Sequence, residues 1–369
     1  MNKFRLIGFL IFLLAAQIAN SQPLLTLEEA ISSAMKNNYD IQLLRNDSTV
    51  DAVNDQYAYA AFLPRLNGAA GANFNNFNTR QKLADGSERK QGGIRSNNIS
   101  ASVNLNWTLF DGLKMFATRD KLAQIAQLGT LNIKNQLVNT VADVVITYYN
   151  IVRQKQQLKA IEEQMGLNEE IVTIATKRLS AGLGAKPQLL QAKVDLNAQI
   201  ASRLKQQTLI DQLKELLNQL MVVDQSTRYD VADSIPYLEE LVVADIMMAA
   251  ELNNTELQIT KQNIKIAQLT LKENKANRYP TLSFNSGYTF VKTQNKLVLN
   301  NFTPLLNRVM GFTYGLNATI PIFNNFNVKR NIKIAQLDID YQNTLFDYQK
   351  WRMNIAITNA FKAYELQKK

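Results

Sequence analysis

The sequence predicts an α+β membrane protein in which long coiled helices are joined to pairs of amphipathic strands. Three observations support this class: an internal repeat, four strand-like segments of membrane-spanning length, and a seven-residue repeat of apolar residues. Residues 27–74 are echoed by residues 243–290 at a constant offset of 216, with Pro64 matching Pro280. Because few folds repeat a unit that combines helices with strands, this pattern restricts the architecture more than any single motif does.

The N-terminus indicates export from the cytoplasm. A basic start is followed by an apolar run over residues 6–16, and Ala19-Asn20-Ser21 places small residues before a cleavage site. The apolar run is shorter than the ~20 residues of a bilayer-spanning helix. We therefore expect a signal peptide over residues 1–21 and a mature chain that begins near Gln22.

The composition argues against most enzymes and against nucleic-acid binding. With no Cys and no His, the chain lacks the residues of the common nucleophilic triads and of the usual zinc sites. Carboxylate pairs could support glycosidase chemistry, but no loop or strand end singles out such a pair. The net charge of +10 comes from dispersed Lys and Arg rather than from a dense basic run. We expect no catalytic residue, no cofactor, no metal and no nucleic-acid partner.

Four segments alternate apolar and polar residues with a period of two, as half-buried strands do. They lie at about residues 65–77, 98–110, 281–291 and 311–322, near the length that a tilted strand needs to cross a bilayer. A soluble sheet would alternate in the same way, but here the polar face is almost uncharged and the other face is rich in aromatic residues. Small polar groups suit a wet lumen, and aromatic rings suit the lipid headgroups. The expected lumen residues are Asn67, Asn73, Asn104, Asn106, Asn285, Asn317 and Thr319, and the expected lipid-facing residues are Trp107, Tyr288, Phe290, Phe312 and Tyr314.

The segments between the strands of each pair, residues 79–98 and 293–310, are polar and contain Gly, Asn or Pro. We expect them to be long loops outside the membrane. The opposite strand ends run directly into helices. Since the smallest known membrane barrels use about eight strands and an open edge in lipid leaves backbone groups unpaired, four strands predict an oligomer.

A long helical hairpin is expected over residues 114–221. A strict heptad of apolar residues indicates left-handed coiling, and a helix over residues 114–180 would be roughly 100 Å long at 1.5 Å per residue. Residues 180–188 supply a glycine stop and a proline restart, which predicts the tip of the hairpin. The seam residues are Leu137, Val144, Ile151, Leu158, Met165, Val172 and Leu179, then Leu189, Leu196, Ile210 and Leu217, with Arg203 interrupting the return.

Several motifs follow one another in an order that carries a family resemblance. They are Leu-Pro-Arg-Leu at 63–66, Tyr-Pro-Thr-Leu at 279–282, Thr-Leu-Phe-Asp-Gly at 108–112, Pro-Ile-Phe-Asn-Asn at 321–325, Arg-Leu-Ser-Ala-Gly-Leu at 178–183 and Leu-Leu-Gln-Ala at 189–192. With the repeat, they make the chain resemble the outer membrane efflux protein family, the TolC-like channels of Gram-negative bacteria. Thr26-Leu27-Glu28-Glu29-Ala30 resembles the first helix start of that family and independently predicts a capping box.

The resemblance implies a TolC-like trimeric β-barrel, with four strands per protomer and twelve in all, continued by a coiled-coil periplasmic tunnel. It implies an exit duct in the cell outer membrane for small molecules, drugs, metals or proteins, without catalysis or cofactor. Its partners would be a periplasmic adaptor protein, an inner-membrane pump of the RND, ABC or a similar class, and outer-membrane lipid. The residues that resemble the adaptor-docking tip are Arg178, Leu179, Ser180, Gly182, Leu183 and Gly184.

Two departures from the family pattern are visible. Lys186-Pro187-Gln188 stands where members often have an acidic residue before the returning helix. The expected organisation is a first repeat over 22–221, a linker over 222–242, and a second repeat over 243–369 with a helix from about residue 326. The second repeat lacks the room for a full hairpin, so we expect a chain truncated at its C-terminus, with the family's constriction beyond Lys369; a native stop codon there would contradict this.

One other class of protein has some of the same features. A secreted periplasmic adaptor or structural protein would also have long helical hairpins, but it would have no pore of its own. Twin pairs of membrane-length strands favour the duct over this alternative.

Overall fold

The computed structural model describes residues 23–224, 227–232, 234–235, 241–297 and 304–368. The signal peptide expected at residues 1–21 lies outside the described residues. The contacts divide the chain into two units, one formed by Met1–Ser48 and Thr130–Thr255 and the other by Thr49–Gly129 and Glu256–Lys369. Each unit therefore combines parts of both sequence repeats.

The first unit is helical apart from one small parallel ladder. It contains β1 (Leu24–Leu25), α2 (Leu27–Asn37), the start of α3 (Tyr39–Gln56), most of α4 (Lys114–Ser180), α5 (Lys186–Met221), β4 (Asp230–Val231) and α6 (Val243–Asn253). β1 pairs with β4 through Leu24↔Asp230 and Leu25↔Val231. The first helix has the predicted capping box, because the Thr26 hydroxyl accepts from the Glu29 N–H and the Glu29 carboxylate accepts from the Thr26 N–H.

The core of the first unit lies where the heptad seams of α4 and α5 meet. Val144, Ile151 and Leu217 are fully buried, and the seam residues nearer the tip are half-buried. The core cluster also includes Ala30 and Ala34 of α2, Tyr148, Tyr229 and Val231. The apolar residues that recur every seven positions thus form a seam that closes within one chain.

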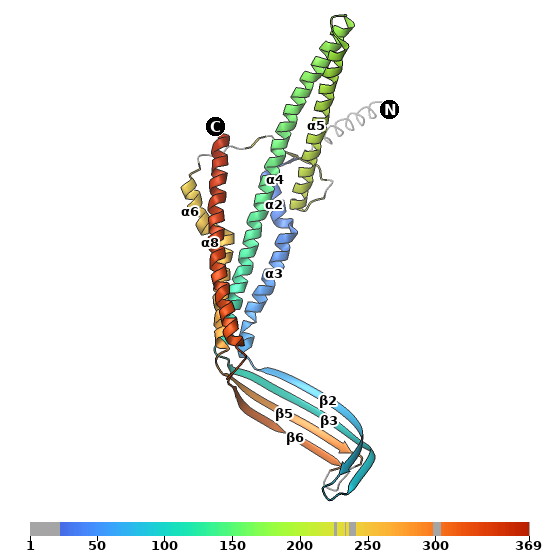
Figure 1. Ribbon diagram of the computed structural model, residues 1–369, viewed down its shortest axis with the longest axis vertical. Helices are drawn as coiled ribbons and strands as arrows, with labels where there is room; N and C mark the ends of the chain where they lie inside the picture. Colours follow the sequence, from blue (N-terminus) through green and yellow to red (C-terminus); the bar gives the residue numbers. More distant parts are fainter. Residues whose placement is uncertain (1–22, 225–226, 233, 236–240, 298–303, 369) are drawn as a thin grey trace, which may run out of the picture. The chain divides into compact units, whose positions relative to one another are not determined.

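The second unit carries the antiparallel sheet. It contains η2 (Ala58–Phe62), β2 (Arg65–Lys82), β3 (Glu88–Phe110), nearly all of α7 (Thr255–Ala276), β5 (Thr281–Asn295), β6 (Leu306–Thr319) and α8 (Asn327–Lys368). The four long strands lie side by side in the order β2-β3-β5-β6, and every pair is antiparallel (Figure 1). The repeat is visible in the element starts, since α2, α3 and β2 begin 216 residues before α6, α7 and β5.

The strands are longer than their apolar residues predicted. Most of residues 79–98, expected to be a loop, extends β2 and β3, and only residues 83–87 form the turn, in which the Leu83 N–H donates to the Ser87 carbonyl at 2.8 Å. Likewise β5 continues to Asn295 and β6 begins at Leu306. The loop prediction was wrong because a ladder joins backbone groups, so polar side chains do not stop it. At its other end β6 stops at Thr319, two residues before Pro321, which has no N–H to donate.

Gly112 joins β3 to α4 in a left-handed conformation that leaves no room for a side chain. Its φ is +73°, and an added Cβ would lie 2.4 Å from the carbonyl oxygen of Ala276 and 2.9 Å from Cβ of Tyr279. The glycine in Thr-Leu-Phe-Asp-Gly is therefore required by the close approach of α7 to this turn.

The contact between the start of α4 and α7 is polar. The buried Glu273 carboxylate accepts from the Thr118 hydroxyl at 2.6 Å and pairs with Lys121. The amide of Gln262, also buried, donates to the carbonyl oxygen of Gln124 at 2.9 Å. Because buried polar groups are costly unless paired, these contacts hold the two helices in one register.

Candidate functional site

The two faces of the sheet differ in chemistry. Directly paired residues in an antiparallel ladder point to the same face, and the register pairs Asn67 with Asn104 and Asn106 with Asn285. Five of the seven expected lumen residues line one hollow together with Gly287, Thr313 and Gly315, and Leu105, Ser286 and Tyr314 of the other alternation also border it. These five are Asn67, Asn104, Asn106, Asn285 and Asn317.

The other two expected lumen residues share that face but lie outside the hollow. Asn73 pairs with Asn98 toward the loop end of the sheet, and Thr319 pairs with Thr281 at the helix end. Arg65, which was not among the expected lumen residues, pairs with Asn106 and brings a positive charge to the same face. The alternation of β2, continued back by one residue from Leu66, would have assigned Arg65 to the polar face.

The opposite face carries all five expected aromatic residues. Tyr288 pairs with Phe312, and their ring centroids are 4.7 Å apart. The Trp107 indole N–H, toward the helix end, donates to the Phe62 carbonyl at 2.8 Å. Phe290 lies toward the loop end, whereas Tyr314 lies in the row that joins Leu105 and Ser286, near the middle. The aromatic residues therefore spread across the face instead of forming two separate rows.

No described element covers the apolar face. Phe312 and Tyr314 are 75% and 81% exposed, and Leu66 is 68% exposed. Among the described residues the outer strands β2 and β6 each have only one partner, so both edges of the sheet are open. An exposed apolar face with two open edges indicates a surface that other molecules must cover.

The predicted tip is a tight helix stop. Gly182 adopts φ +71°, and the Leu183 N–H donates to the Arg178 carbonyl at 2.9 Å while the Gly182 N–H donates to the Leu179 carbonyl at 3.1 Å. The Ser180 hydroxyl donates to the Lys177 carbonyl at 2.8 Å, and an added Cβ at Gly184 would lie 3.1 Å from Cβ of Arg178. Leu183 is 82% exposed at the turn.

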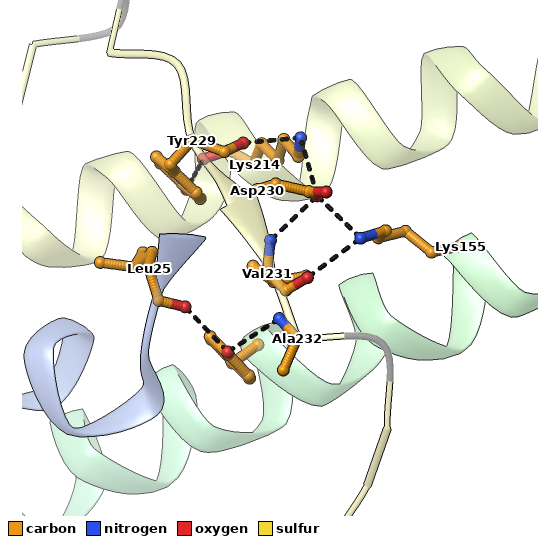
Figure 2. A network of polar contacts seen from close by, with 8 residues as sticks. Leu25, Lys155, Lys214, Tyr229, Asp230, Val231 and Ala232 are labelled. Carbon is orange, nitrogen blue, oxygen red and sulfur yellow. Dashed lines mark hydrogen bonds and ion pairs between the residues drawn. The ribbon is translucent and has the colours of Figure 1, made fainter. Parts of the chain in front are cut away.

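A polar network that the sequence did not predict fastens the linker to the α4–α5 hairpin (Figure 2). Lys155 Nζ donates to the Asp230 carboxylate at 2.8 Å and to the Val231 carbonyl at 3.0 Å. Lys214 Nζ donates to the Tyr229 carbonyl at 2.9 Å, and the Tyr229 hydroxyl donates to the Lys214 carbonyl at 3.1 Å. The segment lacks a periodic pattern, so only the three-dimensional contacts reveal it.

Charge and burial oppose each other at Asp230. Burial disfavours its ionised form, but the hydrogen bonds from Lys155 and the Val231 N–H, with the charges of Lys155 and Lys214, hold its pKa below the ordinary value. Burial raises the pKa of Tyr229. Asp230 therefore stays ionised and Tyr229 stays neutral near neutral pH, so the network does not change with small changes of pH there.

Several helices expose apolar stripes. α8 presents Tyr341, Tyr348 and Trp351 at heptad-like spacing, each at least half exposed, and α4 presents Leu167 and Ile174 seven residues apart.

Among the residues that the structure describes, no three acidic residues gather as a metal site. No described helix is long and apolar enough to cross a membrane.

This combination defines a class of architecture: an antiparallel sheet with one small-polar and one aromatic face, joined to coiled helices. The model of the outer membrane efflux protein family matches residues 30–221. The chain belongs to the outer membrane efflux protein family. Its resemblance to TolC-like channels and its α+β fold class are thereby confirmed.

Relatives agree with this assignment. Protein CyaE of Bordetella pertussis is 23% identical over 73% of this chain and 56% of its own length, so the chain spans little more than half of that relative. Toxin and drug export protein A of Aggregatibacter actinomycetemcomitans is 20% identical over 93% of this chain and 72% of its own length. The family assignment favours an efflux protein over the periplasmic adaptor or structural protein that the sequence left as the alternative.

Solved structures show the same fold. The outer-membrane channel OprN is 13% identical with a TM-score of 0.75, covering 93% of this chain and 74% of its own. The CmeC outer membrane channel of Campylobacter jejuni is 16% identical with a TM-score of 0.74, covering 92% of this chain and 71% of its own. The family and these neighbours are channels and not enzymes.

Proposed function

We propose that this chain provides the strands and helices of one protomer of a trimeric exit duct in the outer membrane of a Gram-negative bacterium. The observation that carries the proposal is the two-faced sheet: an uncovered apolar face beside a small-polar face with a hollow. In lipid the apolar face is covered by acyl chains, and the small-polar face lines an aqueous path.

Open strand edges support a closed assembly of several copies. A backbone group left unpaired in hydrocarbon costs several kcal/mol, so β2 and β6 need partner strands there. Three copies would supply twelve strands and complete the barrel. The exposed stripes of α8 and α4 would pack between copies in the same way, which continues the barrel as a tube of helices.

The hairpin tip is the proposed contact with a periplasmic adaptor served by an inner-membrane pump. Leu183 exposes an apolar side chain on a turn whose backbone is fixed by two hydrogen bonds. An exposed apolar side chain such as Leu183, held on a fixed turn at the end of a long hairpin, can bind in an apolar groove of a partner. Arg178, Leu179, Ser180, Gly182 and Gly184 would shape this contact.

Cysteine labelling tests the duct directly, because the chain has no Cys of its own. Asn104→Cys and Val103→Cys place thiols on opposite faces of β3. In vesicles, a water-soluble thiol reagent should modify Asn104→Cys and reduce single-channel conductance, while Val103→Cys should react only with a lipid-soluble maleimide. Equal labelling of both variants, or no conductance from the unmodified protein, would contradict the proposal.

Docking is tested separately. Leu183→Asp should abolish co-purification with a co-expressed periplasmic adaptor protein and leave conductance unchanged, because the tip lies outside the sheet. Gln207→Asp adds the same charge to an exposed position of α5 and is the matched control. Retention of the adaptor by Leu183→Asp would exclude this residue from the contact.

A further inference from the structure

Two basic residues lie directly opposite each other on the apolar face of the sheet. Lys292 of β5 pairs with Arg308 of β6 in the same row as Ile99 of β3. Arg95 shares this face two rows nearer the loop end, in the row of Asn76. Like charges on a directly opposed cross-strand pair destabilise a sheet unless an anion lies between or above them.

The two hairpins do not provide that anion. Across residues 65–110 and 281–319 the sequence contains nine Lys or Arg and only two carboxylates, Asp85 and Glu88. The Asp85 carboxylate accepts from the N–H and hydroxyl of Ser87, and Glu88 pairs with Arg80 and Lys90. No described carboxylate forms an ion pair with Lys292 or Arg308, so their counter-charge must come from outside the sheet.

The position of the pair on the strands indicates where the anion comes from. Lys292 follows Leu282, the apolar residue nearest the helix end of β5, by ten residues, or about 33 Å along a strand. At the usual tilt of membrane strands this becomes about 25 Å across the bilayer, the height of an apolar band. Phe290 and Met310 form the apolar row just below the pair. With the bilayer on this apolar band, the basic pair would lie where the hydrocarbon ends and the headgroups begin.

We propose that Lys292, Arg308 and Arg95 form a binding site for a phosphorylated lipid headgroup of the outer leaflet. Guanidinium and ammonium groups both bind phosphate, and Arg does so with paired hydrogen bonds. The apolar rows below the site contact the acyl chains of the same lipid. This site rests on the proposed function, because it requires lipid against the apolar face.

The test measures binding of fluorescent lipopolysaccharide to the full-length protein in nonionic detergent by anisotropy. The test variant is Lys292→Gln with Arg308→Gln. The matched control is Arg65→Gln with Lys114→Gln, which removes one charge from the helix end of β2 and one from the start of α4. Each basic residue near a headgroup contributes about fivefold to the affinity, so removing two of them should weaken binding about thirtyfold. The control should stay within about twofold of the unaltered protein.

Two further arms identify the source of the phosphate. Removing the phosphate groups from the lipopolysaccharide should weaken binding to the unaltered protein and abolish its advantage over the test variant. Millimolar inorganic phosphate should not displace the lipid, because it lacks the acyl contacts. Undiminished binding of the dephosphorylated lipid, complete displacement by inorganic phosphate, or equal affinity of both proteins would overturn the site.

Conductance recorded on the same preparations separates the two proposals. If the protein conducts but the test variant binds lipopolysaccharide as tightly as the unaltered protein does, the lipid site alone is overturned. A protein that neither conducts nor enters vesicles would overturn the duct, and the lipid site with it. A test variant that breaks into monomers without losing lipid affinity would assign the pair to contacts between copies and overturn the lipid site.

Discussion

The core of the first unit and the sheet of the second use apolar side chains in opposite ways. Ile151 and Leu217 are fully buried between helices of one chain, whereas Phe312 and Tyr314 remain mostly exposed. The hairpin core is complete within one chain, but the sheet face is not. The difference separates the apolar residues that stabilise the protomer from those that lipid or another copy would cover in the proposed duct.

The largest effect is expected inside the hairpin core. Ile151→Ala should lower the free energy of unfolding by about 2–5 kcal/mol, because it removes buried methylenes and leaves a cavity between α4 and α5. Ile146→Ala, on the same helix at 59% exposure, is the matched control and should cost below about 1 kcal/mol. Thermal unfolding followed by helical circular dichroism measures both, and similar losses would show that the core is misplaced.

The next effect is expected on the sheet and depends on the face. Leu316→Arg should oppose membrane insertion by about 2–4 kcal/mol, because it places a charge among lipid chains. Asn317→Arg changes the neighbouring residue on the polar face and should insert almost normally. Denaturant titration of folding into lipid vesicles compares them. Equal penalties would contradict the assignment of the two faces and remove the contrast with the hairpin core.

A smaller effect separates the two sequence repeats. Thr26 caps α2 through a capping box, whereas Val242 precedes α6 without a side-chain cap. Thr26→Ala should destabilise the protein by about 1 kcal/mol, because it leaves the Glu29 N–H of the first turn without its acceptor. Val242→Ala removes no cap and should change stability much less. Melting temperatures measure both, and an equal shift would show that the cap contributes nothing.

The smallest effect concerns the polar network. Asp230→Asn should cost below about 1 kcal/mol at pH 7, because the carboxylate is partly exposed and surface ion pairs contribute little. The folded pKa of Asp230 lies below its unfolded value of about 3.9, so its contribution is present above that pH and is lost as pH falls through the lower folded pKa. The difference between the two proteins should hold from pH 7 to about pH 5 and shrink below about pH 4. A difference unchanged at pH 3 would exclude the charge as its cause.

Much of the fold was predictable because periodicity reflects local geometry. The alternation around Val103 and Asn104 assigned each residue to a face, and the heptad through Val144 and Ile151 identified the seam. The loop over residues 79–98 was predicted wrongly, because polarity was taken to end pairing that backbone groups continue. The lumen, belt and tip roles of single residues stay predictions, since sharing a face does not establish a role.

Sequence alone determined which residues share a face, where helices stop at glycine and restart at proline, and the twofold repetition of the plan. The first two depend on neighbours within a few residues along the chain, and the third is the recurrence of such local patterns, so pattern is enough. Only the tertiary structure decided that Gly112 must admit the Ala276 carbonyl, that Asp230 meets Lys155, and that Lys292 stands opposite Arg308. The first two pairs are distant in sequence, and nothing local encodes which helix or strand will come to lie beside another. The third pair lies within one hairpin, and there the tertiary structure decided the register of the two strands.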